Sequence, residues 1–237
     1  MQLKRRQKGF TLVEIAVVLV IIGLLLGGVL KGQELISSAR VRNLADQQAG
    51  IQAAYFGFQD RYRAVPGDMD GEDAARAIGV ADDPTTYPGG NSNGRLEDPT
   101  GSNWTELNAV WVHLSDSGFL KGSYEGSGSA PTAGNSDVSP VNVFSSPVVL
   151  ARHDGFVGNS TSRLLLHMGQ NIPADIAREL DTKLDDGRPE TGILRNATEA
   201  ASPEVYQSGA DCVDTAENPS IWDIETNAQN CNPTYLF

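Results

Sequence analysis

The chain has 237 residues and a formal net charge of −12, from 30 acidic and 18 basic side chains. A chain this acidic is not expected to bind nucleic acid through a broad basic face. It contains no Gly-x-Ser-x-Gly elbow, no phosphate-binding loop and no dinucleotide-binding fingerprint, and its three histidines are too far apart in the sequence for a zinc-binding spacing. The sequence therefore predicts neither an enzyme nor a nucleic-acid-binding protein.

A short basic segment opens the chain and a long apolar segment follows it. Residues 1–9 contain four basic side chains and no acid, and residues 10–30 are apolar except for Thr11 and Glu14. About 21 residues are enough to span a hydrocarbon core of about 30 Å as a helix. Positive charge that precedes a span stays on the cytoplasmic side. We therefore expect everything after Leu30 to lie outside the inner membrane.

Glu14 is the unusual residue of the apolar segment. A carboxylate inside an apolar helix costs several kcal/mol unless a partner neutralises it, so it marks a functional position. In an ordinary secretory signal peptide the apolar region is shorter, about 7–15 residues, and cleavage would follow Ala39. In a plain signal anchor, Glu14 would have no role. The length of the apolar segment argues against a secretory signal peptide, and the acid inside it argues against both alternatives.

The residues Gly9, Phe10, Thr11, Leu12 and Glu14 resemble the start of type IV pilins and type II secretion pseudopilins. The resemblance covers about the first 60 residues. It implies that a prepilin peptidase cuts between Gly9 and Phe10 and methylates the new amine, and that Glu14 acts in assembly. It also implies single-pass insertion in a bacterial inner membrane with a periplasmic head, and then a periplasmic or cell-surface filament. The implied partners are other pilin or pseudopilin subunits and an inner-membrane assembly platform.

An amphipathic helix is predicted to continue the apolar segment. Residues 31–63 contain no proline, and Pro66 with Gly67 ends the helical pattern. Apolar side chains at helical spacing form one face, at Leu44, Ile51, Tyr55, Phe58 and Tyr62. The side chains expected to point outward are Arg42, Asp46, Gln48, Gln52 and Gln59. We therefore expect one helix from about Thr11 to Arg63.

The rest of the chain predicts an α+β head with a small antiparallel sheet and extra short helices. Two helices are expected: one from Trp104 to a stop at Gly118, with Asn103 and Glu106 as a capping box, and one from Pro173 to Leu184. The expected strands are 141–144, 148–150, 163–167 and 192–195. The predicted domains are a leader (1–9), a transmembrane half (10–30) and an amphipathic half (31–65) of one helix, and a globular head (66–237).

Cys212 and Cys231 are the two cysteines of the chain. Because the membrane segment is expected to export them to an oxidising compartment, they predict one disulfide bond. The alternative is two unrelated free thiols. Closing a loop of about 20 residues would stabilise the fold by about 3 kcal/mol.

Two polar segments are candidates for a calcium site. Asn91 and Asn93 precede Gly94 in an oxygen-rich loop, and Asp98 or a distant acid such as Asp82 would have to complete the six to eight oxygen ligands that calcium takes. A second candidate is the acidic turn formed by Asp181, Asp185 and Asp186 before Gly187. Ordinary Asn-Gly and Asp-Gly turn chemistry is the simpler explanation of both. No other cofactor is expected.

Three functions remain open on the sequence alone. The first is a structural subunit of a pilus or pseudopilus, as the resemblance implies. The second is a membrane-anchored binding or adhesive protein that does not polymerise. The third is a soluble periplasmic protein released after Ala39.

Overall fold

The computed structural model describes residues 11–80, 86–97, 104–159, 161–198 and 204–237. The chain divides into two units, Met1–Ala39 and Arg40–Phe237. Helix α1 (Leu12–Tyr62) begins in the first unit and ends in the second. It is continuous over 51 residues, which confirms the predicted single helix. The helix ends where Arg63 takes a left-handed conformation (φ 56°), three residues before Pro66.

The described part of the first unit is Thr11 and the N-terminal half of α1, which is apolar as far as Leu30 except for Glu14. Its large apolar side chains between Leu12 and Leu30 are all 46–86 % exposed. The most apolar 18-residue window of this helix has a mean hydropathy of 2.8, and by length and composition the helix can cross a membrane. An apolar surface of this kind on every side of a helix needs lipid or other helices around it.

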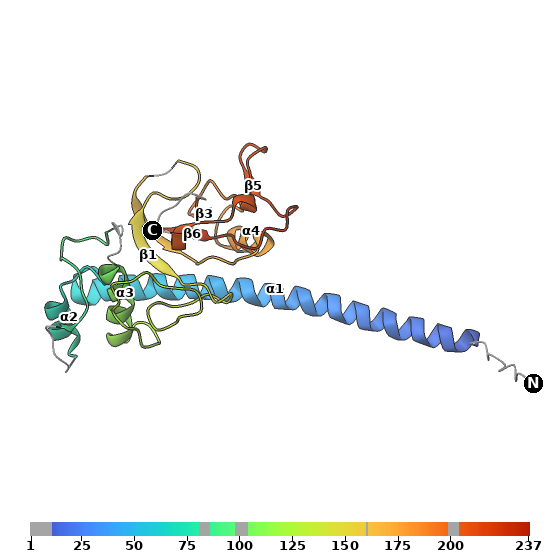
Figure 1. Ribbon diagram of the computed structural model, residues 1–237, viewed down its shortest axis with the longest axis horizontal. Helices are drawn as coiled ribbons and strands as arrows, with labels where there is room; N and C mark the ends of the chain where they lie inside the picture. Colours follow the sequence, from blue (N-terminus) through green and yellow to red (C-terminus); the bar gives the residue numbers. More distant parts are fainter. Residues whose placement is uncertain (1–10, 81–85, 98–103, 160, 199–203) are drawn as a thin grey trace, which may run out of the picture. The chain divides into compact units, whose positions relative to one another are not determined.

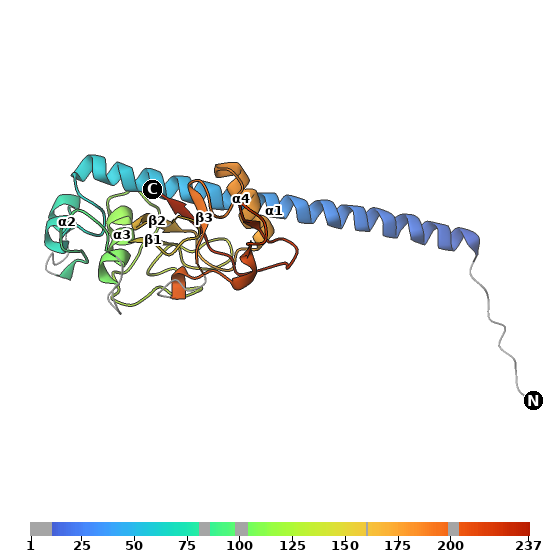
Figure 2. The ribbon, with the colours of Figure 1, turned by 90° about the horizontal axis from the view of Figure 1, so that it is seen from above.

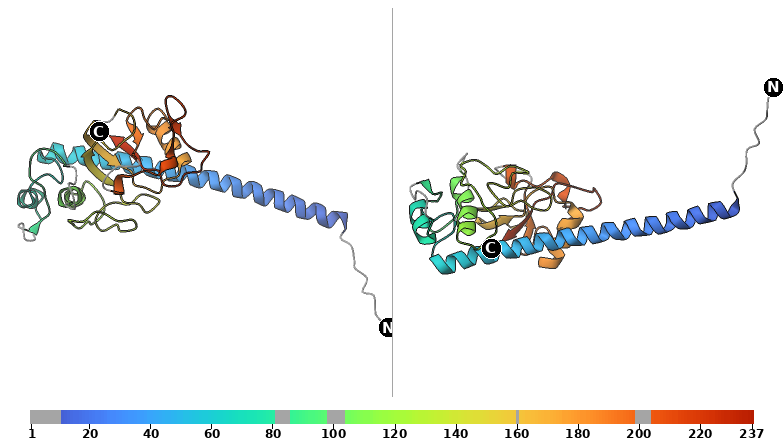
Figure 3. Two further views of the ribbon diagram at one scale, coloured as in Figure 1. Left: turned by 45° about the horizontal axis from the view of Figure 1, so that its top comes forward. Right: turned by 90° about the horizontal axis from the view of Figure 1, so that it is seen from below.

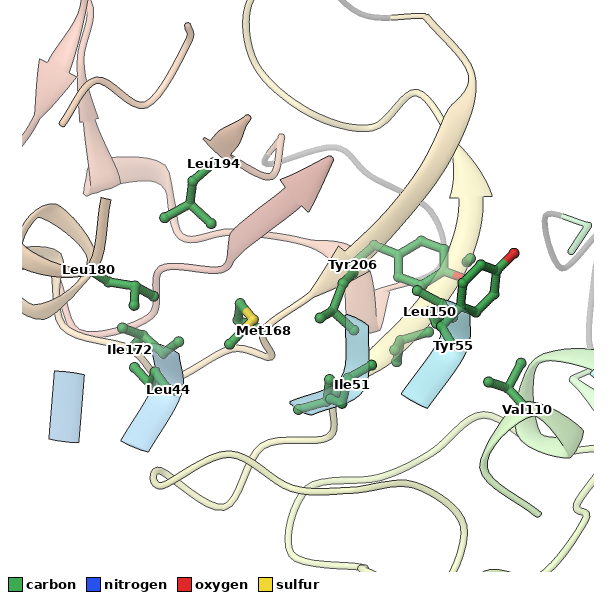
Figure 4. Packing of buried hydrophobic residues seen from close by; sticks show 14 of the residues in the cluster. Leu44, Ile51, Tyr55, Val110, Leu150, Met168, Ile172, Leu180, Leu194 and Tyr206 are labelled. Atoms are coloured by element: carbon green, nitrogen blue, oxygen red, sulfur yellow. The ribbon is translucent and has the colours of Figure 1, made fainter. Parts of the chain in front are cut away.

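In the second unit, the C-terminal half of α1 supplies one wall of the main core. Its buried side chains include Leu44, Ile51, Tyr55 and Phe58, as predicted. Figure 4 shows the first three of these facing core side chains of other elements. Gln48 was expected to point outward, but it is buried and donates through Nε2 to the Gln52 side chain at 3.1 Å. The contact face of the helix is therefore wider than its apolar stripe.

The head contains a four-stranded antiparallel sheet. Its strands are β1 (Val149–His153), β2 (Arg163–His167), β6 (Pro233–Leu236) and β3 (Leu194–Asn196), in that spatial order. Two short strands, β4 (Val213–Asp214) and β5 (Ile221–Trp222), form a second small sheet. In Figures 1 and 3 the main sheet lies beside the C-terminal half of α1. This architecture confirms the predicted α+β class.

Among the described residues, the head also contains three further α-helices and two 3₁₀ helices. They are α2 (Gly71–Ile78), α3 (Thr105–Asp116), α4 (Ala174–Leu184), η2 (Glu204–Tyr206) and η3 (Ala210–Cys212). Helix α2 lies next to the end of α1 in Figures 1 and 2. It begins where the Asp70 side chain accepts hydrogen bonds from the amides of Glu72 and Asp73, and ends at Gly79 with φ 87°.

The predicted helix starts and strands need two corrections. Helix α3 has Trp104 at its N-cap and no side-chain cap there, whereas the expected cap, Asn103, lies outside the described residues. Residues 141–144 are not a strand: Val141 forms only an isolated bridge with Pro147. The Asn142 side chain instead accepts hydrogen bonds from the amides of Phe144 (2.8 Å) and Ser146 (3.0 Å). These bonds close a turn in place of a strand.

Candidate functional site

Glu14 lies in the first turn of α1 and is bound by its own chain. The backbone amide and the hydroxyl of Thr11 both donate to Oε2, at 2.7 and 2.8 Å. The Glu14 amide in turn lies 3.3 Å from the Thr11 hydroxyl oxygen, so the two residues cap the helix reciprocally. Both bonds to the carboxylate use one oxygen, and among the described residues Oε1 accepts none. The Glu14 carboxylate therefore has one oxygen, Oε1, that can still accept a hydrogen bond.

The surroundings of Glu14 make such a partner important. The neighbouring Leu12, Val13 and Ile15 are exposed apolar side chains, and the same apolar surface continues to Leu30. In hydrocarbon, an ionised carboxylate with half of its oxygens unpaired is strongly unfavourable. Gly9 and Phe10, the residues predicted to be processed, lie outside the described residues, so their role stays a prediction.

The predicted calcium loop is organised around a buried acid. Asp68, which is 2 % exposed, accepts hydrogen bonds from the amides of Asn93 (3.0 Å) and Gly94 (2.8 Å). The side-chain oxygen of Asn91 accepts from the Asn93 amide, and that of Asn93 accepts from the Arg95 amide. These contacts favour the turn interpretation. Asp98 and Asp82 lie outside the described residues, so calcium at Asn91, Asn93 and Asp98 stays a prediction.

The second acidic turn brings three carboxylates together at the end of α4. Asp181, Asp185 and Asp186 each offer an oxygen that lies within 4.8 Å of the others. Asp181 is fully buried, and its Oδ2 accepts a 2.7 Å hydrogen bond from the Trp222 indole nitrogen. Burial raises the pKa of Asp181 to about 7; the Trp222 bond and the Gly187 amide oppose this shift, and the two neighbouring acids add to it.

Hydrogen bonds from the following loop fix the other two acids. Asp185 Oδ2 accepts from the amides of Ile193 and Leu194, the second at 3.1 Å. Asp186 accepts from the Arg188 amide at 2.9 Å and from the Thr191 hydroxyl at 2.5 Å. Both side chains are therefore held in place by the turn that follows the helix.

Two histidines that are distant in the sequence meet inside the head. His153 ends β1 and His167 ends β2, and their Nε2 atoms lie 2.6 Å apart. The Gly155 amide donates to His153 Nδ1 at 2.8 Å, and His167 Nδ1 lies 2.8 Å from the Thr234 hydroxyl. We assign the protons accordingly: His153 carries its proton on Nε2 and donates to His167, whose Nδ1 proton goes to Thr234.

Burial keeps this histidine pair neutral. The Tyr206 ring stacks on both imidazoles, at 4.4 and 4.6 Å between ring centres. Burial lowers the pKa of His153 to about 4, with a small opposing effect from Asp154. Burial, and then His153 itself, lower the pKa of His167 well below its usual value. No local pattern in the sequence indicates this pairing, because the two histidines lie fourteen positions apart.

Cys212 and Cys231 form the predicted disulfide bond, with their Cα atoms 5.6 Å apart. Both are fully buried within the main core. Cys231 also pairs with Ile172, just before α4, through backbone hydrogen bonds. The disulfide therefore ties η3 to the segment that precedes β6.

Residues 4–30 match the prokaryotic N-terminal methylation motif. This motif is a class III signal peptide typical of type IV pilins and pseudopilins, which confirms the resemblance seen at Gly9, Phe10 and Glu14. No curated protein and no solved structure matches the chain significantly. The chain is a prepilin-like protein; its motif implies processing by prepilin peptidase, and its apolar helix suggests an anchor in the inner membrane.

Proposed function

We propose that the chain is a structural subunit of a type IV pilus or of a type II secretion pseudopilus. The observation that carries this proposal is the exposed apolar half of α1 with its one half-satisfied carboxylate, Glu14. Such a surface is suited first to lipid and then to the equivalent helices of neighbouring copies. Proteins with this motif are typically non-enzymatic, and the proposed role is accordingly structural.

Processing would divide the chain as follows. Prepilin peptidase removes residues 1–9 and methylates the amine of Phe10, which keeps its positive charge. Residues 10–30 hold the product in the inner membrane, residues 31–65 continue the helix, and residues 66–237 form the periplasmic head. An inner-membrane assembly platform then moves the subunit into a filament.

Glu14 would act when one copy packs against the next. Its free oxygen, Oε1, would accept a hydrogen bond from the Phe10 amine of a neighbouring subunit, while Oε2 stays bonded to Thr11. Two unit charges about 4 Å apart attract by about 4 kcal/mol at an effective dielectric constant near 20. Removing one partner of a buried pair typically costs about 3–5 kcal/mol, because the other charge stays unpaired. Assembly should therefore depend on Glu14 more than insertion does.

The mass of the mature protein tests the first step. Loss of residues 1–9 together with the gain of one methyl group is expected. An intact chain would indicate a membrane-anchored binding or adhesive protein, and loss of 39 residues would indicate secretion.

Filament incorporation tests the second step. We expect Glu14→Ala to be inserted and largely cleaved, yet to enter filaments poorly at wild-type expression. Glu34→Ala is the matched control, because Glu34 is an exposed acid of the same helix that pairs with Lys31 at 2.8 Å outside the apolar segment. Incorporation of Glu14→Ala at the level of Glu34→Ala would refute the assembly role.

A further inference from the structure

We propose that Asp181, Asp185 and Asp186, at the C-terminal end of α4, bind one calcium ion. The three residues form the acidic turn of the head in which one oxygen from each lies within 4.8 Å of the others. The site is independent of the proposed assembly role, because it involves neither Glu14 nor the apolar half of α1.

The acids are held in position by the fold. Asp185 fixes the returning loop through Oδ2, which binds the amides of Ile193 and Leu194, and among the described residues its Oδ1 accepts no hydrogen bond. Asp186 is anchored in the same loop through the Arg188 amide. Side chains fixed in this way lose little conformational entropy when they bind an ion.

A buried oxygen without a partner points to the ion. Asp181 is 0 % exposed, and its Oδ2 is held by Trp222. Its Oδ1 is buried and accepts no hydrogen bond from the part of the chain that the structure describes, although the Gly187 amide lies close enough to the carboxyl group to favour its charged form. A buried acceptor left unsatisfied is unfavourable, more so when it carries charge. A cation shared with Asp185 and Asp186 would satisfy it.

No ion pair among the described residues neutralises this cluster, and the charge of Arg195 interacts with Asp185 and Asp186 only at longer range. Within the described ranges, none of the three carboxylates forms an ion pair. The nearby Lys183 pairs with Glu179 at 3.2 Å, and Arg188 donates to the Pro219 carbonyl at 3.0 Å. The hollow beside the cluster, open to solvent, is lined by Asp186 and by further acids that include Asp214, Glu217 and Asp223, as well as by Arg178 and Arg188. An ion can therefore reach Asp186 from solvent through a mainly acidic opening, and the buried Asp181 lies behind it.

The spacing suits calcium better than magnesium. Oxygens on opposite sides of a calcium ion lie about 4.6–5.2 Å apart, since each is about 2.3–2.6 Å from the metal. For magnesium the corresponding separation is about 4.0–4.2 Å, and the octahedral geometry is stricter. Oxygens spread over as much as 4.8 Å can thus contact one calcium ion with little movement. Backbone carbonyls and water would supply the remaining ligands.

Terbium luminescence in the full-length protein, purified in detergent, tests the site directly. Tb³⁺ replaces Ca²⁺ and emits when a neighbouring tryptophan is excited, and Trp222 contacts Asp181. We expect emission that Ca²⁺ displaces at lower concentration than Mg²⁺. Trp222→Phe should lose most of this emission, although Trp104 and Trp111 remain.

A thermal-shift titration with calcium alone provides the quantitative test. We expect a Kd of about 10⁻⁴–10⁻³ M and a rise in the Tm of the head of about 3–6 °C at ten times Kd. Asp186→Asn should weaken calcium binding at least about tenfold. Glu217→Gln, which removes an exposed charge from the same hollow, should leave Kd within about twofold.

Three results would overturn the proposal. The first is the absence of both a calcium-dependent shift and terbium emission, which would leave a proton shared among the acids as the explanation. The second is equal weakening by Glu217→Gln and Asp186→Asn, which would mean diffuse attraction to an acidic surface. The third is stronger competition by Mg²⁺ than by Ca²⁺. If Asp186→Asn fails to fold, the terbium competition and its dependence on Trp222 decide alone.

Discussion

Acid should weaken the head through His153. In the folded protein, His153 Nδ1 accepts the Gly155 amide at 2.8 Å and Nε2 donates to His167. A second proton would have to sit on Nδ1, directly opposite the Gly155 N–H group. The buried cation would then lose that hydrogen bond and face a donor. Folding therefore favours the neutral ring, in agreement with the lowered pKa of His153.

The sign and size of the effect follow from linkage. The pKa of His153 falls from 6.5 in the unfolded chain to about 4 in the fold. Between these values the unfolded state binds more protons, so the free energy of unfolding decreases as the pH falls. The stability that depends on neutral His153 is present in full well above pH 6.5. Relative to that limit, the free energy of unfolding is lower by about 2 kcal/mol at pH 5 and by about 3 kcal/mol at pH 4. The buried Asp181 and the partly buried Glu106 act in the opposite direction, because desolvation raises the pKa of each to about 7.

The effect of His153 is isolated by comparing how much unfolding free energy the wild type and the His153→Gln variant lose between two pH values. The assay is urea unfolding of the unit Arg40–Phe237, which contains the whole main core, at pH 7 and pH 5. In His153→Gln, an amide N–H group replaces the Nε2–H donor to His167 without a titrating group. We expect the wild type to lose about 2 kcal/mol more than this variant between the two pH values. Equal losses within about 0.5 kcal/mol would show that His153 is not the acid-sensitive group.

Three other predictions concern the core, the disulfide and the leader. Cys212→Ser with Cys231→Ser should lower the free energy of unfolding by about 2–5 kcal/mol, measured by urea titration against the oxidised wild type. Phe58→Ala should cost about 3–5 kcal/mol in the same assay, because Phe58 is fully buried, whereas the half-exposed Phe56→Ala should cost much less. Gly9→Leu should leave uncleaved precursor in the membrane, seen as an unshifted band beside the processed wild type.

The helices could be predicted from sequence because their signals are local. The apolar segment and the spacing of Leu44, Ile51 and Phe58 predicted α1 to within a residue or two at each end. Pro173 similarly marked the start of α4. Gln48 was wrongly expected to point outward. A side-chain amide can be buried when a neighbour accepts its hydrogen bond, as Gln52 does here, and hydropathy alone cannot predict such a bond.

The sheet was harder to predict because its order depends on distant pairings. Residues 141–144 have strand-forming side chains, yet Asn142 draws two backbone amides into a turn. Strand β6 was missed because it has only four residues and begins with a proline, and its place between β2 and β3 is set by tertiary contacts.

The candidate functional residues also fall into two groups, those that local sequence predicts and those that only tertiary contacts bring together. The methylation motif and Glu14 could be recognised from consecutive residues, and the pairing of Cys212 with Cys231 followed from there being two cysteines. The role of Asp68 could not be foreseen, since it reaches the 91–97 loop across a gap of about 25 residues. The histidine pair likewise exists only because β1 and β2 are antiparallel neighbours.

The position of β6 has a consequence for the order in which the head can be completed. The β1–β2 hairpin can form as soon as those residues have been synthesised, but β2 and β3 meet only through β6, the last strand in chain order. A chain synthesised from its N-terminus therefore keeps two unpaired strand edges until Pro233–Leu236 arrive. Export and folding of the head should thus finish together, and a chain stalled before Pro233 would present open edges to proteases and chaperones.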